Sequence, residues 1–95
     1  MADTIIVFTL NGCGHCSSLK KRLGEISIPF QEVEINQNRQ IWDQVVSQTG
    51  HNLLPTVFIR TDGTDVGPIY IPSRDYETED EIVEILKKHT EEGGL

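Results

Sequence analysis

Apolar residues at the start of the chain predict a buried strand followed by a helix. Residues 4–9 are mostly β-branched with almost no polar interruption, as expected of a central strand covered on both faces of its sheet. After a break at Asn11 and Gly12, apolar side chains recur at spacings of three and four, on one helix face. They are Cys16, Leu19, Leu23 and Ile26. The residues expected to face water are Lys20, Lys21 and Arg22.

A second strand and a second helix follow in the pattern. Ile28-Pro29 ends the first helix, and residues 30–35 alternate apolar and polar as in a half-exposed strand. Helical spacing returns over residues 38–49, with Gly50 as the terminating residue. The helix face expected against the sheet consists of Ile41, Trp42, Val45, Val46 and Thr49.

The second half of the chain predicts a hairpin and a closing helix. Residues 56–60 and 66–71 are strand-like and flank Asp62-Gly63, which favours a tight antiparallel turn. Thr78 and Glu81 form a capping box before a helix whose expected buried residues are Ile82, Val83, Ile85 and Leu86, and residues 91–95 are expected to fray. The order βαβ, helix, ββα predicts a single α/β domain over residues 1–95, with three helices on both faces of a four-stranded mixed sheet.

Net charge and hydropathy limit which kinds of partner and which cellular compartment we expect. The formal net charge is -7, from 15 acidic residues against 8 Lys and Arg, which argues against a nucleic-acid partner. Nothing at the start resembles a signal peptide and no apolar run approaches the roughly 20 residues of a membrane span, so we expect a soluble cytoplasmic protein.

Acidic residues concentrate between positions 75 and 84. We interpret them as a solvated face or a helix start, with a surface for a basic partner as the alternative.

Two cysteines carry the candidate chemistry. A bridge between Cys13 and Cys16 would close too small a loop to staple the fold, so we interpret the pair as reactive. Cys13 is expected near a helix N-cap, where backbone N–H groups and neighbouring donors lower a thiol pKa from about 8.5 to roughly 3.5–7.5. Because Cys16 shares the first helical turn, Cys13 is predicted to attack a substrate disulfide and the more buried Cys16 to resolve the mixed disulfide.

Residues near the cysteines are predicted to adjust the thiol pKa and to bind the substrate. Gly14 and His15 separate the cysteines and are predicted to tune the thiol pKa. A partly protonated His15 would stabilise the thiolate and make the pair a better oxidant, with an exposed loop histidine as the alternative. Pro55 follows the apolar pair Leu53-Leu54 and precedes a strand. We expect a cis Leu54–Pro55 bond that exposes the Leu54 backbone beside the cysteines, where an extended substrate could add as a strand.

Together these features resemble the glutaredoxins of the thioredoxin superfamily. The landmarks, in order, are Ile6-Val7-Phe8, Cys-x-x-Cys, Thr49-Gly50 and residues 54–59, and they cover nearly the whole chain. The resemblance implies a thioredoxin-like, glutaredoxin-type three-layer fold and disulfide reduction, with no tightly bound cofactor and glutathione as a possible reductant. It also implies substrate or glutathione contacts at Gly12, Leu54, Pro55 and Gly67. The small electron donors of ribonucleotide reductase look similar too.

The chain departs from the glutaredoxins at three usual glutathione contacts. Leu10-Asn11-Gly12 lacks the customary lysine, Asn52 stands where a basic residue is common, and Gly67-Pro68 replaces a Gly-Gly turn. The motif Cys-Gly-His-Cys and residues 70–74 resemble the protein disulfide isomerases instead, although Gly12 stands where those proteins have a Trp.

Several alternatives stay open. The pair could be recycled by glutathione or by a thioredoxin-type reductase, or it could carry out isomerase-like exchange. An iron–sulfur cluster shared between two protomers through Cys13 and glutathione is a different class of function, against which the altered glutathione contacts count. A zinc site built from the cysteines with His15, His51 or His89 lacks a second ligand pair at the usual spacing. We expect a monomer that acts on disulfide-containing proteins.

Overall fold

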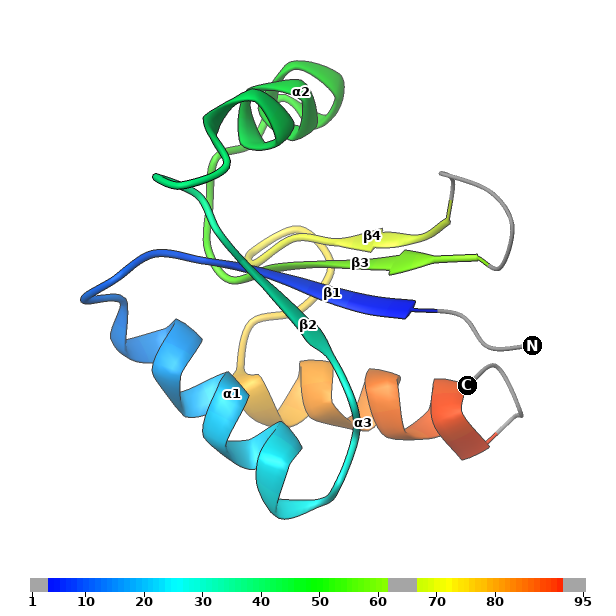
Figure 1. Cartoon of the computed structure of the whole chain (residues 1–95). Coiled ribbons are helices and arrows are strands. Elements are labelled where there is room, and N and C mark those ends of the chain that lie inside the picture. The colour runs from blue at the N-terminus through cyan, green and yellow to red at the C-terminus, as the bar shows by residue number, and fades with distance from the viewer. Residues whose placement is uncertain (1–3, 62–66, 92–95) are drawn as a thin grey trace.

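The protein has three layers, with a sheet between α2 on one side and α1 and α3 on the other (Figure 1). This arrangement comes from a computed structural model, which describes residues 4–61 and 67–91. The elements are β1 (Thr4–Thr9), α1 (Gly14–Glu25), β2 (Gln31–Glu34), α2 (Arg39–Thr49), β3 (Thr56–Arg60), β4 (Ile69–Tyr70) and α3 (Glu79–Glu91). The predicted order of elements and the three-layer thioredoxin-like fold are confirmed.

The sheet brings two distant segments to one edge. Its strand order is β2-β1-β3-β4, with β2 parallel to β1 and with β3 antiparallel to both β1 and β4. Phe8 near the end of β1 pairs with Thr56 at the start of β3. The turn that follows β1 and the Leu54–Pro55 segment that precedes β3 therefore lie at the same end of the sheet.

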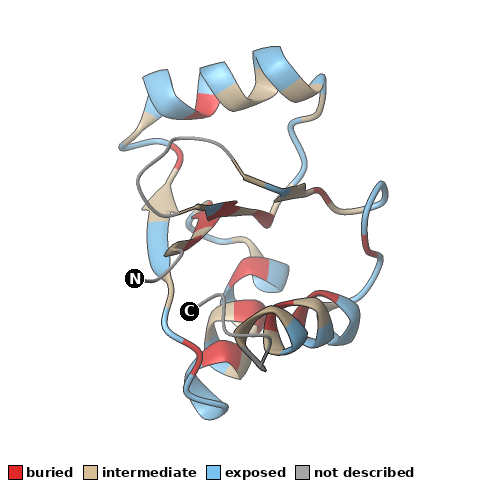
Figure 2. Ribbon diagram, turned by 90° about the vertical axis from the view of Figure 1, so that its right-hand side faces the viewer, coloured by how far each residue is buried: buried red, intermediate tan, exposed pale blue. Residues whose placement is uncertain are grey.

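The apolar core is split by the sheet into two clusters. The larger one fills the space between the sheet and α1 and α3, and includes Leu19, Leu23, Ile82 and Leu86, all 0% exposed. The smaller one lies under α2, where the rings of Phe8 and Trp42 pack with their centroids 5.5 Å apart. Figure 2 shows the buried positions along the strands and on the helix sides that face them.

The predicted buried faces of α1 and α2 were wrong at one residue each. Ile26 is 41% exposed because α1 ends at Glu25, which leaves Ile26 as the C-cap. Ile41 is 48% exposed because α2 packs through Trp42, Val45 and Val46, and these residues define a stripe that Ile41 does not share.

Three other expectations differ in detail. Lys20 and Arg22 are half-buried rather than fully in water, because they form ion pairs with Glu32 and Asp80. Strand β4 covers only Ile69–Tyr70, and it does not extend to Ile71 because the Ile71 N–H bonds to the Asp75 side chain rather than to a neighbouring strand. Glu91, expected in a frayed tail, is instead the last residue of α3. The predicted Asp62-Gly63 turn, Val66 and residues 92–95 lie outside the described residues.

Candidate active site

The cysteine pair lies at the N-terminus of α1, as predicted. Cys13 is the N-cap residue with an extended backbone (φ -80°, ψ 110°), and its sulfur accepts a hydrogen bond from the Cys16 N–H at 3.2 Å. The two cysteines are joined by a disulfide, with their Cα atoms 5.3 Å apart. Cys16 is 1% exposed whereas Cys13 is half-buried. Cys13 is thus the sulfur that a substrate can reach.

A tight turn presents Cys13. The Cys13 N–H donates to the Leu10 carbonyl at 3.0 Å, and Gly12 between them has φ +88°, which only glycine adopts readily. The Asn11 N–H donates to the Glu34 carboxylate at 3.3 Å, so the end of β2 anchors this turn. Sequence reasoning treated Glu34 only as an outward strand residue. Gly14 differs from Gly12 in having no positive φ, and a side chain at Gly14 would meet nothing within 4 Å.

His15 connects the active-site turn to the start of α3. Its Nδ1 lies 2.9 Å from Glu79 Oε1, and the imidazole is 78% exposed. The hydrogen bond from His15 is the main cause that holds the pKa of Glu79 below its ordinary value. Tuning of the thiol by His15 stays a prediction, whereas its carboxylate partner was missed. The only sequence signal for Glu79 was its place in the acidic first turn after a capping box.

This ion pair predicts a pH-dependent effect on stability. Because the folded pKa of Glu79 is lowered, its contribution is present above the unfolded value of about 4.3 and is lost as pH falls through the folded pKa. We expect His15→Ala to lower the free energy of unfolding at pH 6 and to have a much smaller effect at pH 2.5. Urea unfolding at both pH values measures this, with the exposed Ser17→Ala as control. An equal loss at both pH values would contradict the prediction.

A buried tyrosine, Tyr76, is hydrogen-bonded to the backbone of Pro55. The Leu54–Pro55 bond is cis, as predicted, and Pro55 is buried. The Tyr76 hydroxyl donates to the Pro55 carbonyl, and burial raises the pKa of Tyr76, so its phenol keeps its proton. Thr56 Oγ1 donates to the Leu53 carbonyl at 2.6 Å. Tyr76, 21 residues along the chain from Pro55, had not been singled out from the sequence.

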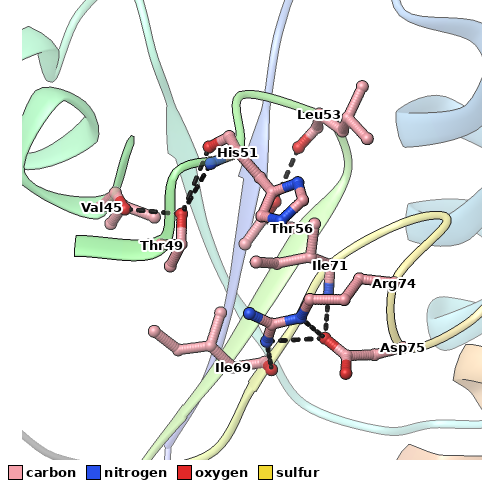
Figure 3. A network of polar contacts seen from close by, with 9 residues as sticks. All are labelled: Val45, Thr49, His51, Leu53, Thr56, Ile69, Ile71, Arg74 and Asp75. Carbon is pink, nitrogen blue, oxygen red and sulfur yellow. Dashed lines mark hydrogen bonds and ion pairs between the residues drawn. The ribbon is translucent and has the colours of Figure 1, made fainter. Parts of the chain in front are cut away.

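A polar network supports the segment that leads into Pro55 (Figure 3). Thr49 Oγ1 donates to the Val45 carbonyl and accepts from the His51 N–H. Opposite it, Asp75 accepts from the Ile71 N–H and from Arg74, both at 2.9 Å. Burial alone would raise the pKa of Asp75, but these bonds outweigh it, so the pKa is lowered. The first set of bonds thus orders the turn after α2, and the second orders the loop after β4.

Gly67 does not join the cysteines. It lies beside Ile59, near the end of β3, whereas the cysteine turn adjoins the start of that strand. A Cβ at Gly67 would lie 1.8 Å from the Ile59 carbonyl oxygen, so close backbone packing explains this glycine. The interpretation of Gly67 as a glutathione contact therefore finds no support in the fold. Gly12, Leu54 and Pro55 do lie at the active-site end.

The three histidines lie apart. His15 pairs with Glu79, His51 follows α2, and His89 lies in the last turn of α3. Within residues 4–61 and 67–91, no group of three or more His, Cys, Asp or Glu side chains is placed to hold a metal ion. Among the same residues, no helix is both long and apolar enough to cross a bilayer.

The fold and the site define a class of protein. A thioredoxin-like sheet with a Cys-x-x-Cys disulfide at the N-terminus of its first helix is the architecture of a thiol-disulfide oxidoreductase. Residues 5–64 match the family model of the glutaredoxins. The chain therefore belongs to the glutaredoxin family.

Individual relatives agree with this assignment. A Bacillus subtilis (strain 168) protein named N-acetyl-S-hydroxy-L-cysteine reductase is 29% identical over 55 residues, which are 58% of this chain and 59% of the relative. The chain thus spans about three-fifths of that curated relative. A buckwheat glutaredoxin-glutathione complex superposes with a TM-score of 0.57 at 25% identity, covering 98% of this chain and 73% of the other. A Malassezia sympodialis thioredoxin, with a TM-score of 0.61, 16% identity and coverage of 93% and 75%, shows the shared fold alone.

Proposed function

We propose that the chain reduces protein disulfides by a dithiol mechanism. The Cys13 thiolate attacks one sulfur of the substrate disulfide, that S–S bond breaks, and one substrate thiolate leaves. The Cys16 thiolate then attacks the Cys13 sulfur and releases the second substrate thiol. The substrate gains two electrons and two protons, and the Cys13–Cys16 pair ends as a disulfide. The observation that supports this order is the half-buried N-cap sulfur of Cys13 in front of the fully buried Cys16.

The source of electrons for the next cycle is part of the proposal. Glutathione is one candidate, because the buckwheat relative was solved with it, and a thioredoxin-type reductase is the other. Equilibration of the pair in glutathione buffers, with mass spectrometry for a Cys13 adduct, separates them. A potential of about -200 to -230 mV with an adduct supports glutathione, and one near -270 mV without an adduct supports a reductase. A value near -180 mV would favour isomerase-like exchange.

Two finer substrates deserve direct assays. Donation of electrons to ribonucleotide reductase is reduction of a protein disulfide, and the pre-reduced chain can be tested against the oxidised enzyme in a single turnover. The name of the Bacillus subtilis relative suggests a small sulfenic acid as a second candidate. There Cys13 would attack the sulfenic sulfur, hydroxide would leave as water, and Cys16 would release the reduced thiol. Consumption of N-acetylcysteine sulfenic acid at one protein disulfide per turnover would support it.

An apolar contact surface at Leu54 gives a further prediction. Leu54 is half-buried beside the groove at Pro55, and its neighbour Leu53 is 41% exposed. We expect Leu54→Asp to lower kcat/KM for a protein disulfide about tenfold, because a carboxylate there opposes apolar burial. Reduction of 2-hydroxyethyl disulfide should change little. Ile41→Asp, an exposed apolar site on α2, is the matched control, and unchanged turnover of the protein substrate in Leu54→Asp would contradict the prediction.

A further inference from the structure

The groove beside the cysteine turn is lined by both apolar and acidic side chains. It has a volume of about 240 Å³, and Leu54, Pro55 and Pro72 supply apolar surface. Glu77 and Glu79 supply carboxylates. His15, two residues after Cys13, lines the same groove, so the groove adjoins the first turn of the helix whose N-cap is Cys13. None of the described residues that line the groove is Lys or Arg.

Most carboxylates around this groove already have partners. Asp75 pairs with Arg74, Asp80 with Arg22, and Glu79 with His15. Glu81 completes the capping box, accepting from the Thr78 N–H at 3.2 Å. Through these contacts, most of the acidic residues between positions 75 and 84 either begin a helix or form ion pairs. This agrees with the interpretation of the run as a helix start.

Glu77 is the exception within this run. It precedes the capping box, lines the groove and is exposed. Within the part of the chain that the structure describes, its carboxylate makes no hydrogen bond or ion pair, although its backbone N–H donates to Glu81. An ionised carboxylate at the edge of an apolar groove favours a cationic group on the ligand and opposes an anionic one.

We propose that the groove binds a peptide segment of the substrate protein that carries Lys or Arg beside the disulfide cysteine, with Glu77 as its partner. The proposal deepens the disulfide reduction proposed above and rests on it. The apolar floor at Leu54, Pro55 and Pro72 receives the neighbouring aliphatic part of that segment. A volume of about 240 Å³ is below the roughly 300–1,000 Å³ of typical small-molecule sites. A surface-running peptide therefore fits better than a compact ligand.

Three model peptides test the choice of substrate. Each carries the same internal disulfide and differs only at the two flanking positions, which are Lys, Gln or Glu. The reduced protein is mixed with each peptide in a single turnover, and its oxidation is followed by acid quenching and thiol alkylation. We expect rates in the order Lys, Gln, Glu, with about tenfold between the extremes at low salt. The range should shrink to about twofold in 0.5 M salt, because Glu77 is exposed and screening weakens its field.

Charge reversal separates the groove from the overall charge of the protein. Glu77→Lys is expected to invert the order of the three peptides and to leave the reduction potential of the pair unchanged. Glu25→Lys makes the same change in net charge at the far end of α1 and should preserve the order. Equal rates for all peptides, or an equal effect of both variants, would overturn the proposal. Failure to reduce even the Gln peptide would instead refute the disulfide reduction on which it rests.

Discussion

Replacing Cys16 with Ser is expected to stop the reaction at a covalent intermediate between Cys13 and the substrate. Cys13 would still attack the substrate disulfide, since its N-cap position and the Cys16 backbone N–H remain. The buried hydroxyl could not displace the substrate thiol, because a neutral alcohol is a far poorer nucleophile than a thiolate. Turnover of a protein disulfide should fall at least 100-fold. Non-reducing electrophoresis and intact-mass measurement should show one substrate thiol per chain.

Cys13→Ser is the matched control for the covalent intermediate expected in Cys16→Ser. It should be as inactive as Cys16→Ser but should accumulate no adduct, because the buried Cys16 lies behind the N-cap position and is 1% exposed. A substrate adduct on Cys16 in the Cys13→Ser protein would contradict the assigned order of attack. Substantial turnover in Cys16→Ser would show instead that an external thiol resolves the intermediate.

The arrangement of the cysteines was accessible from the sequence because it depends on local geometry. A strand, a glycine turn and a helix within residues 4–25 suffice to place Cys13 at an N-cap and Cys16 on the buried side of the first turn. The expected cis bond at Pro55 came from its position before a strand in a Cys-x-x-Cys chain. The first inference needed only neighbours within a few positions, and the second also used the cysteine motif, which lies far from Pro55 in the sequence.

Contacts between distant segments account for what was missed. His15 and Glu79 are 64 residues apart, Asn11 and Glu34 are 23 apart, and neither pair carries a sequence signal. Gly67 shows the opposite error, since a plausible family landmark lies beside Ile59, away from the site. Which residues meet depends on where their segments lie in the sheet, because the end of β1 pairs with the start of β3.

The limits of periodicity are visible within α1. The periodicity predicts Leu19 and Ile26 on the same buried face, but Leu19 is 0% exposed and Ile26 is 41% exposed. Helical spacing gives the direction of a side chain around the axis and says little about where the helix stops. Since α1 ends at Glu25, Ile26 leaves the stripe. The two residues therefore provide a matched pair for measuring what burial contributes.

Leu19→Ala should cost about 2–5 kcal/mol of unfolding free energy, the usual range for a fully buried leucine. Against a typical total of about 5–15 kcal/mol, this loss would bring the protein near its folding limit. Ile26→Ala should cost much less, about 0.5 kcal/mol, because Ile26 is 41% exposed and lies beyond the end of the helix. Urea unfolding of both variants in the reduced and the oxidised protein measures the difference. Leu19 lies one turn after Cys16 and belongs to the cluster between α1, α3 and the sheet. Similar losses for the two variants would mean that the stability of α1 does not come from this buried stripe.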